Sequence, residues 1–318
     1  MQLEKIYSLG LLGEKMKIMY YPGCTLYTKA KNLGELAKAS AEILEIELKE
    51  LENWTCCQAA FPLVSDNIMG LISASRILIN AEKESSKLTT LCSFCYNVLK
   101  RTNHILKNDP EKRAKICEFL EEDYKGDIEV KHFLEIIRDG VGFDGLKEKI
   151  KKKLDGLKVA PYYGCQILRP ASVLKLDDPE NPKILDDFLT SLGCYVVDFP
   201  FKVECCGSYQ VINQKAKDVV LSCSHNILDS AEKNGAEAIA LTCPVCYFNL
   251  DKKQKEMAQK FNDYKQIPIL YFTELLGLAL DVDKKLYDFG KHYIDPRPLL
   301  VEKGLIGNQV AKNKEDVQ

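Results

Sequence analysis

The sequence predicts an α/β fold: two pseudo-symmetric Rossmann-like α/β domains with parallel sheets, arising by internal duplication. Two observations support this prediction. Strand-like and helix-like hydrophobic patterns alternate along the 318 residues. A series of one, two and two cysteines also occurs twice, with gaps of 31 and 34 residues the first time and 39 and 36 the second. The ten cysteines are Cys24, Cys56, Cys57, Cys92 and Cys95, then Cys165, Cys205, Cys206, Cys243 and Cys246.

The two halves also match around their cysteines. Residues 91–99 (Leu-Cys-Ser-Phe-Cys-Tyr-Asn-Val-Leu) align with 242–250 (Thr-Cys-Pro-Val-Cys-Tyr-Phe-Asn-Leu), and 21–24 align with 162–165. We therefore predict two cysteine-rich domains followed by a tail that forms an extended arm. The predicted bounds are 1–155 for the N-terminal domain, with 1–16 as an extension, 156–290 for the C-terminal domain, and 291–318 for the tail.

In the first half, three short β-prone runs are separated by helical periodicity. Cys24 is expected in the turn after the first strand, Cys56 and Cys57 in a loop, and Cys92 to Cys95 in a turn before a helix. Asp66 is a candidate N-cap. The expected strands are 17–21, 88–91 and 128–131, and the expected helices are 33–48, 66–84, 96–106 and 111–124, followed by two more.

The second half repeats this order with four strands. Because the carboxyl ends of parallel strands meet at one edge of a sheet, we expect the cysteine loops of each half to converge there. The expected strands are 157–163, 195–199, 238–242 and 267–271, and the expected helices are 182–192, 211–233, 247–261 and 273–280.

Composition favours a soluble globular protein in the cytoplasm. Hydrophobic residues make up 46% of the chain and charged residues 28%. No apolar run approaches the roughly 20 residues of a membrane span, and the N-terminus lacks the layout of a signal peptide. The net charge of −2 gives no reason to expect a nucleic-acid partner.

Cysteines clustered as Cys-x-x-Cys pairs in a reducing compartment indicate metal binding or redox chemistry rather than disulfides. Buried structural thiols would suit Cys117, Cys194 and Cys223, which lie outside the repeated pattern. Structural zinc takes four ligands, and a zinc site in one of the two modules stays an alternative. A thioredoxin-like dithiol at Cys243 and Cys246 would leave the other three cysteines of that half without a role. An iron-sulfur cluster in each half would use thiolates, and five thiolates exceed the four of an ordinary cubane.

The repeated pattern resembles the cysteine-rich CCG module, and two copies in one chain resemble the B subunit of heterodisulfide reductase from about Met16 to Asp283. The resemblance includes 163–165, 177–182, 205–207, 243–246 and 275–280. It implies two noncubane 4Fe–4S clusters, each held by the five cysteines of one module, and a small disulfide of the coenzyme M–coenzyme B type reduced between them. The implied partners are a ferredoxin-like C subunit, which supplies the electrons, and a flavin-bearing A subunit.

The sequence departs from that family at Gln58, Tyr162, Gln166, Tyr247 and 208–211, while all ten predicted ligands are kept. An alternative function is therefore an electron-transfer subunit that relays electrons to or from another enzyme without acting on the heterodisulfide.

Three weaker signals remain. Gly140-Val141-Gly142-Phe143-Asp144-Gly145 follows a predicted helix, so a helix-ending turn is favoured over a nucleotide site. Lys29, Arg169 and Lys202 lie near predicted ligands and could meet an anionic substrate or form surface ion pairs. Trp54 is expected to form an apolar wall beside Cys56.

Overall fold

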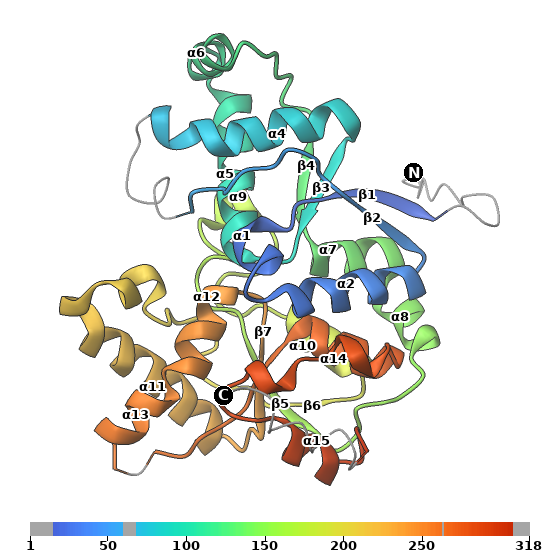
Figure 1. Cartoon of the computed structure of the whole chain (residues 1–318), viewed down its shortest axis with the longest axis vertical. Coiled ribbons are helices and arrows are strands. Elements are labelled where there is room, and N and C mark those ends of the chain that lie inside the picture. Colours follow the sequence, from blue (N-terminus) through green and yellow to red (C-terminus); the bar gives the residue numbers. More distant parts are fainter. Residues whose placement is uncertain (1–14, 60–67, 263, 308–318) are drawn as a thin grey trace, which may run out of the picture.

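The computed structural model describes residues 15–59, 68–262 and 264–307 and contains one four-stranded parallel sheet in each half. The strand order is β2-β1-β3-β4 in the first sheet and β6-β5-β7-β8 in the second, so the two sheets have the same topology. In Figure 1 the first sheet lies in the upper part of the molecule and the second in the lower part. The predicted pair of parallel α/β units is confirmed.

In the first sheet, β1 (Met16–Tyr20) lies between β2 (Ile46–Glu50) and β3 (Lys87–Thr90), and β4 (Glu129–His132) pairs with β3. The strands that the sequence predicted near 17, 88 and 128 are thus present. The helices are α1 (Gly23–Tyr27), α2 (Lys31–Ile43), α4 (Ile72–Glu84), α5 (Ser93–Asn108), α6 (Pro110–Leu120), α7 (Phe133–Ile136) with the π-turn η2 (Ile137–Val141), and α8 (Phe143–Lys149).

Strand β2 corrects the prediction of a helix over 33–48. Helix α2 ends at Ile43, and Glu45 adopts a left-handed φ of 62° that turns the chain into β2. This strand pairs with β1 alone and buries only Ile46 fully, so its charged residues face water. A charged edge strand lacks the alternation of apolar and polar residues by which a strand is recognised. The Lys and Glu residues of β2 also fit the polar positions of the helical pattern before it, so the predicted helix ran on to residue 48.

In the second sheet, β5 (Lys158–Tyr162) lies between β6 (Tyr195–Val196) and β7 (Ala238–Leu241), and β8 (Ile269–Tyr271) pairs with β7. All four predicted strands are present, although β6 has only two residues. The helices are α9 (Ala171–Leu174), α10 (Ile184–Ser191), α11 (Lys217–Lys233), α12 (Pro244–Tyr247), α13 (Gln254–Lys260) and α14 (Phe272–Leu280).

Two predicted helices of this half are interrupted. The helix expected over 211–233 begins only at Lys217, after the 3-10 segments η3 (Ser208–Ile212) and η4 (Gln214–Ala216). The helix expected over 247–261 is divided by the π-turn η5 (Phe248–Lys252). In η3 and η4 no residue is buried, which leaves little packing to hold a regular helix there.

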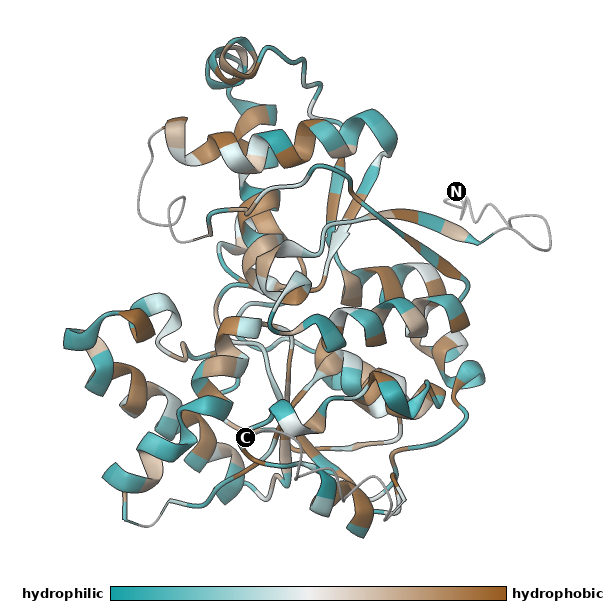
Figure 2. Ribbon diagram, in the orientation of Figure 1, coloured by the Kyte–Doolittle hydropathy of each residue, from teal (hydrophilic) through white to brown (hydrophobic). Residues whose placement is uncertain are grey.

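The two halves interlock through α14 and α7. Helix α14 follows the second sheet but packs on α2 of the first half, and α7 of the first half packs on α10 of the second. The Thr273 hydroxyl donates a hydrogen bond to the Leu33 carbonyl (3.1 Å). A single apolar core therefore spans both halves, and in Figure 2 apolar colour follows the strands and the helix faces turned toward them.

The segment after α14 corrects the prediction of an extended arm. It forms η6 (Lys284–Leu286), η7 (Phe289–Lys291) and α15 (Arg297–Glu302), and it buries Phe289 and Leu300. Its apolar residues are too widely spaced to show helical periodicity, so composition alone indicated a polar tail. Residues 1–14, the Asp66 cap and the tail beyond 307 lie outside the described residues, and the domain boundaries near 155 and 290 stay predictions.

Candidate metal centres

The ten predicted cysteine ligands all lie in segments that follow the carboxyl ends of strands. In the first half, Cys24 follows β1, the Cys56–Cys57 pair follows β2, and Cys92 follows β3. The second half places Cys165, the Cys205–Cys206 pair and Cys243 after β5, β6 and β7. Because the strands are parallel, these segments meet at one edge of each sheet, as the sequence predicted.

The five cysteines of the first half line one common pocket. Cys57, Cys92 and Cys95 are buried, and Cys24 and Cys56 are exposed. The Sγ atoms of Cys57 and Cys95 are 3.5 Å apart. Tyr209, Pro244 and Val245 of the second half also line this pocket, so it lies at the junction of the two halves.

Four of the five cysteines of the second half form two close pairs. The Sγ atoms are 3.4 Å apart in the Cys206–Cys246 pair and 4.0 Å apart in the Cys165–Cys205 pair. Two amide side chains donate to the sulfurs: Gln166 to Cys165 (3.4 Å) and Asn249 to Cys206 (3.5 Å). Asn249 was not among the predicted site residues; its only sequence signal is a polar residue three positions after Cys246, and it lies buried in η5.

The two Cys-x-x-Cys motifs lie side by side. Cys92 and Cys243 are close enough for each thiol to shift the pKa of the other, downward for Cys92 and upward for Cys243. Beside them, the Ser93 and Thr242 hydroxyls are 2.8 Å apart. The Tyr271 hydroxyl is within hydrogen-bond distance of the carbonyls of both Leu91 (2.6 Å) and Thr242 (2.8 Å). The two cysteine sites therefore adjoin across the pseudo-symmetric interface of the halves.

Thiol–thiol hydrogen bonds shift the acidity of these cysteines. Hydrogen bonds from Cys56 and Cys95 hold the pKa of Cys57 well below its usual value. A hydrogen bond from Cys165 lowers the pKa of Cys205 to about 6. Cys92 also caps the N-terminus of α5, where the helix dipole favours a thiolate. Thiolate is the form that binds metal. Other cysteines of the same modules are shifted the opposite way: hydrogen bonding with neighbouring thiols and burial raise the pKa of Cys95 and Cys246, so a bound metal centre would displace their protons.

The donor set fits a cofactor held by sulfur. Iron-sulfur clusters take cysteine thiolates, and zinc takes them as well. Within the described residues, no three cysteine, histidine or carboxylate side chains form a ready-made site for a single metal ion. Zinc in one module stays an open alternative.

The three cysteines outside the pattern occupy different surroundings. Cys194 is buried, and burial raises its pKa to about 12. Cys117 lies on α6, and Cys223 lies on α11 in the neighbourhood of Cys205 and Cys206. None of the three lines the pocket of the first module.

Two of the basic residues considered for an anionic substrate are held in ion pairs. Arg169 contacts Glu180 (2.8 Å) and also donates to backbone carbonyls of Val203 and Pro179. Lys202 is buried and contacts Asp198 (2.7 Å). Lys29 is exposed. These contacts favour the ion-pair interpretation for Arg169 and Lys202.

Two further sequence signals have structural explanations. The glycine-rich run lies between η2 and α8, where Gly142 has a φ of 77°, so it ends a helix as predicted. Trp54 packs edge-on against Tyr21 (ring centroids 5.6 Å apart) and Tyr27 (5.1 Å), and it does not line the pocket. Trp54 therefore supports the segment that leads to Cys56 rather than forming the wall we expected.

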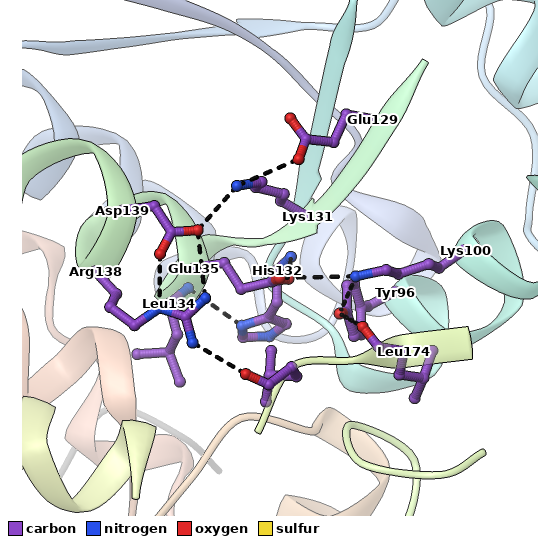
Figure 3. Close-up of polar contacts among 11 residues, drawn as sticks. Tyr96, Lys100, Glu129, Lys131, His132, Leu134, Glu135, Arg138, Asp139 and Leu174 are labelled. Atoms are coloured by element: carbon purple, nitrogen blue, oxygen red, sulfur yellow. Dashed lines mark hydrogen bonds and ion pairs between the residues drawn. The ribbon is translucent and has the colours of Figure 1, made fainter. Parts of the chain in front are cut away.

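A polar network joins β4 and α7 to α5 (Figure 3), and His132 links this network to the residue that follows β3. His132 Nε2 donates to the Leu91 carbonyl (3.2 Å), and the Glu135 carboxylate accepts from the His132 backbone (2.8 Å). Lys100 donates to the Tyr96 hydroxyl (2.7 Å) and faces Glu135. Burial lowers the pKa of His132 to about 4, so this ring stays neutral near pH 7 while it holds the residue before Cys92.

We predict that the substitution Gly23→Ala will disturb the first module and leave the second intact. Gly23 has a φ of 71°, and a Cβ there would lie 2.9 Å from Cys95 Sγ. The left-handed backbone costs an alanine about 1–2 kcal/mol, and the contact with Cys95 adds to that loss. Thermal unfolding and bound metal per chain would measure both effects.

Gly235 provides a matched control for this substitution. Gly235 has a φ of 92°, but an added Cβ would meet no atom within 4 Å. Gly235→Ala should show the backbone cost and retain all bound metal. Equal loss of metal in the two variants would contradict the steric role assigned to Gly23.

Comparison with known proteins agrees with this architecture. The family model described as "CCG: Cysteine-rich domain" matches twice, at residues 18–100 and 159–251. The chain is 31% identical to the 8-methylmenaquinol:fumarate reductase membrane anchor subunit of Wolinella succinogenes, over 88% of this chain and 98% of that protein. It is 32% identical to the B subunit of ferredoxin:CoB-CoM heterodisulfide reductase of Methanosarcina mazei, over 83% and 89% of the two chains.

A solved structure shows the same fold. The structure of a hypothetical protein from Helicobacter pylori superposes with a TM-score of 0.69 at 14% identity, over 88% of this chain and 53% of that one. Within the part of the chain that the structure describes, no helix has both the length and the apolar character to cross a bilayer. Two matched cysteine modules and similarity over most of the chain lead to one conclusion: this chain belongs to the CCG cysteine-rich domain family that includes the B subunit of heterodisulfide reductase.

Proposed function

We propose that this chain is the iron-sulfur subunit of a heterodisulfide-reductase-like complex. It binds two noncubane 4Fe–4S clusters, one in each five-cysteine module, and it reduces a small disulfide of the coenzyme M–coenzyme B type between them. Its electrons come from a ferredoxin-like C subunit served by a flavin-bearing A subunit. Relatives from methanogens that are named as the B subunit of heterodisulfide reductase support this assignment.

The observation that carries the proposal is the adjacency of the two cysteine sites. Reducing a disulfide needs two electrons and two protons and yields two thiols, so two neighbouring redox sites suit one substrate. Ser93, next to Cys92, and Thr242, next to Cys243, are hydrogen-bonded across the interface (2.8 Å), and the pocket of the first module is completed by Tyr209 and Val245 of the second. When bound, the clusters would supply the electrons.

The protein's own residues shape the space between the modules. Phe94 and Tyr209 pack with their ring centroids 4.8 Å apart, and both line the pocket of the first module. Apolar surface of this kind limits the access of water to the thiolates, and solvent exposure is one factor that sets cluster potential. Among the described residues, the side-chain amides of Asn249 and Gln166 donate to sulfur in the second module, whereas in the first module the Gln58 backbone N–H donates to Cys56 (3.4 Å), so the two modules differ in the donors around their thiolates.

Metal and sulfide analysis of anaerobically purified protein tests the cofactor assignment. Two 4Fe–4S clusters predict about eight iron atoms and about eight acid-labile sulfides per chain. About one zinc per module with no iron would contradict the proposal, and iron in one module with zinc in the other would halve the expected iron.

A second candidate function is an electron relay without disulfide chemistry. The specific observation that favours it is the similarity to a subunit of a quinol:fumarate reductase, whose name mentions no disulfide. The pre-reduced, cluster-loaded chain would be mixed with coenzyme M–coenzyme B disulfide and the free thiols counted. Release of two thiols per disulfide supports the reductase. Oxidisable clusters without thiol release support the relay.

A further inference from the structure

Tyr21 and Tyr162 occupy the same position in the two modules and make the same contact. Tyr21 directly follows β1, and Tyr162 is the last residue of β5. Both side chains are fully buried. The Tyr21 hydroxyl donates to the Thr55 carbonyl at 2.8 Å, and the Tyr162 hydroxyl donates to the Glu204 carbonyl at 2.8 Å. These acceptors are the residues immediately before the adjacent cysteine pairs Cys56–Cys57 and Cys205–Cys206.

Each hydrogen bond joins two segments that carry cysteines. The tyrosine stands three residues before the first cysteine of its module, and the acceptor carbonyl stands one residue before the adjacent pair. Both cysteine pairs lie in irregular backbone without helix or strand hydrogen bonds. A buried hydrogen bond is therefore one of the few fixed points that set the position of each pair.

The rings also lie close to the turn that carries the first cysteine. A Cβ added to Gly164 would lie 3.1 Å from the Tyr162 hydroxyl oxygen, and one added to Gly23 would lie 3.5 Å from the Tyr21 ring. Both glycines have positive φ, 61° and 71°. Each tyrosine thus touches one cysteine segment through its ring and the other through its hydroxyl.

Serines on helices also bond to the cysteine pairs. Ser73, on α4, donates to the Cys56 carbonyl (2.9 Å), and Ser224, on α11, donates to the Cys206 carbonyl (3.1 Å). The cysteine pair is therefore held between a helix and the first strand of its own sheet. The tyrosine hydroxyl is the contact that both modules share between the pair and the segment of the first cysteine; in the second module the Tyr163 and Gly164 backbone N–H groups also donate to the Lys202 carbonyl (2.9 and 3.2 Å).

We propose that Tyr21 and Tyr162 are matched positioning residues: each spans from the first-cysteine turn to the adjacent cysteine pair of its own module and sets the separation of these thiolates. The inference depends on one part of the proposed function, namely that each module binds a metal centre. Neither tyrosine is assigned a chemical step. Each acts through the backbone carbonyl that precedes the cysteine pair.

The test is cysteine alkylation of the metal-loaded chain, read residue by residue. Anaerobically purified wild type, Tyr21→Phe and Tyr162→Phe would be treated with iodoacetamide, and modification of each cysteine would be followed by mass spectrometry. We expect Cys56 and Cys57 to react about tenfold faster in Tyr21→Phe. This factor corresponds to about 1.4 kcal/mol, within the range for a buried carbonyl that loses its donor. Cys205 and Cys206 should respond in the same way to Tyr162→Phe.

Selectivity for one module separates positioning from general destabilisation. In each variant the other module should react at the wild-type rate, which also shows that the chain is folded. The electron paramagnetic resonance spectrum of the reduced chain should change in each variant, and the two changes should differ because different modules are affected. Equal acceleration in both modules, or no acceleration in either, would overturn the proposal.

Two neighbouring tyrosines serve as controls. The Tyr20 hydroxyl is buried with no hydrogen-bond partner among the described residues, so Tyr20→Phe removes an oxygen and no bond. The Tyr163 hydroxyl donates to Asp186 (2.6 Å) at the start of α10, so Tyr163→Phe removes a buried bond that does not reach a cysteine pair. Both controls should retain wild-type alkylation rates, and an acceleration matching that of Tyr21→Phe or Tyr162→Phe would count against the inference.

Failure of this inference is distinguishable from failure of the proposed function. If the purified chain contains zinc instead of iron, the iron-sulfur assignment fails, but zinc also protects thiolates from alkylation. The module-selective pattern then still decides whether the tyrosines position the cysteine pairs.

Discussion

Replacing Cys57 with alanine is expected to empty the first module while the second stays loaded, so that bound iron per chain falls by about half. Cys57 is buried, its Sγ atom lies 3.5 Å from that of Cys95, and it lines the pocket shared by all five cysteines of its module. A missing thiolate at this position cannot be replaced by water without exposing the buried sulfurs around it. Iron and sulfide analysis of anaerobically purified chains would measure the loss.

The second module supplies the matched experiment. Cys206→Ala removes the equivalent thiol, which lies 3.4 Å from Cys246, and should cost the other half of the iron. Cys117→Ala removes a thiol on α6 that lies outside both modules, and it should leave the iron content unchanged. Full iron retention in Cys57→Ala, or equal loss in Cys117→Ala, would contradict the ligand assignment.

Replacing Phe272 with alanine is expected to destabilise the whole chain by about 3–5 kcal/mol, the usual cost of truncating a buried phenylalanine. Phe272 begins α14 and is completely buried between the halves. Its ring packs against Tyr271 (5.3 Å between centroids) and His132 (5.6 Å), and against Phe188 (6.1 Å). Urea unfolding would show a lower midpoint with an unchanged slope.

Phe119 is the control for this second prediction. It lies on α6 with 60% of its surface exposed, so Phe119→Ala should change stability by no more than about 0.5 kcal/mol. A cost below about 1 kcal/mol for Phe272→Ala would show that the interface between the halves contributes little to folding. We expect the larger cost, because the packing of α14 on α2 and of α7 on α10 joins the halves into one core.

Most strands were predictable because each has a short apolar run followed by a turn. Val159 and Ala160 in β5, or Ile239 and Leu241 in β7, are fully buried and leave a clear local signal. Strand β2 could not be recognised in this way, because its charged side chains face water at the edge of the sheet. The segment over 284–307 was misjudged for a related reason: its few buried residues are anchored by contacts with distant elements.

By itself, the sequence determined the ten-cysteine pattern, the duplication and the alternation of strands and helices. These features depend on spacing and on local hydrophobic pattern, and parallel sheets then require the cysteine segments to meet at one edge. Only the tertiary structure decided that Ser93 and Thr242 join the two Cys-x-x-Cys motifs, that Tyr209 lines the pocket of the other module, and that Tyr21 and Tyr162 bond to the carbonyls before the cysteine pairs. Such contacts join residues far apart in the chain, and packing of whole elements rather than spacing sets their geometry.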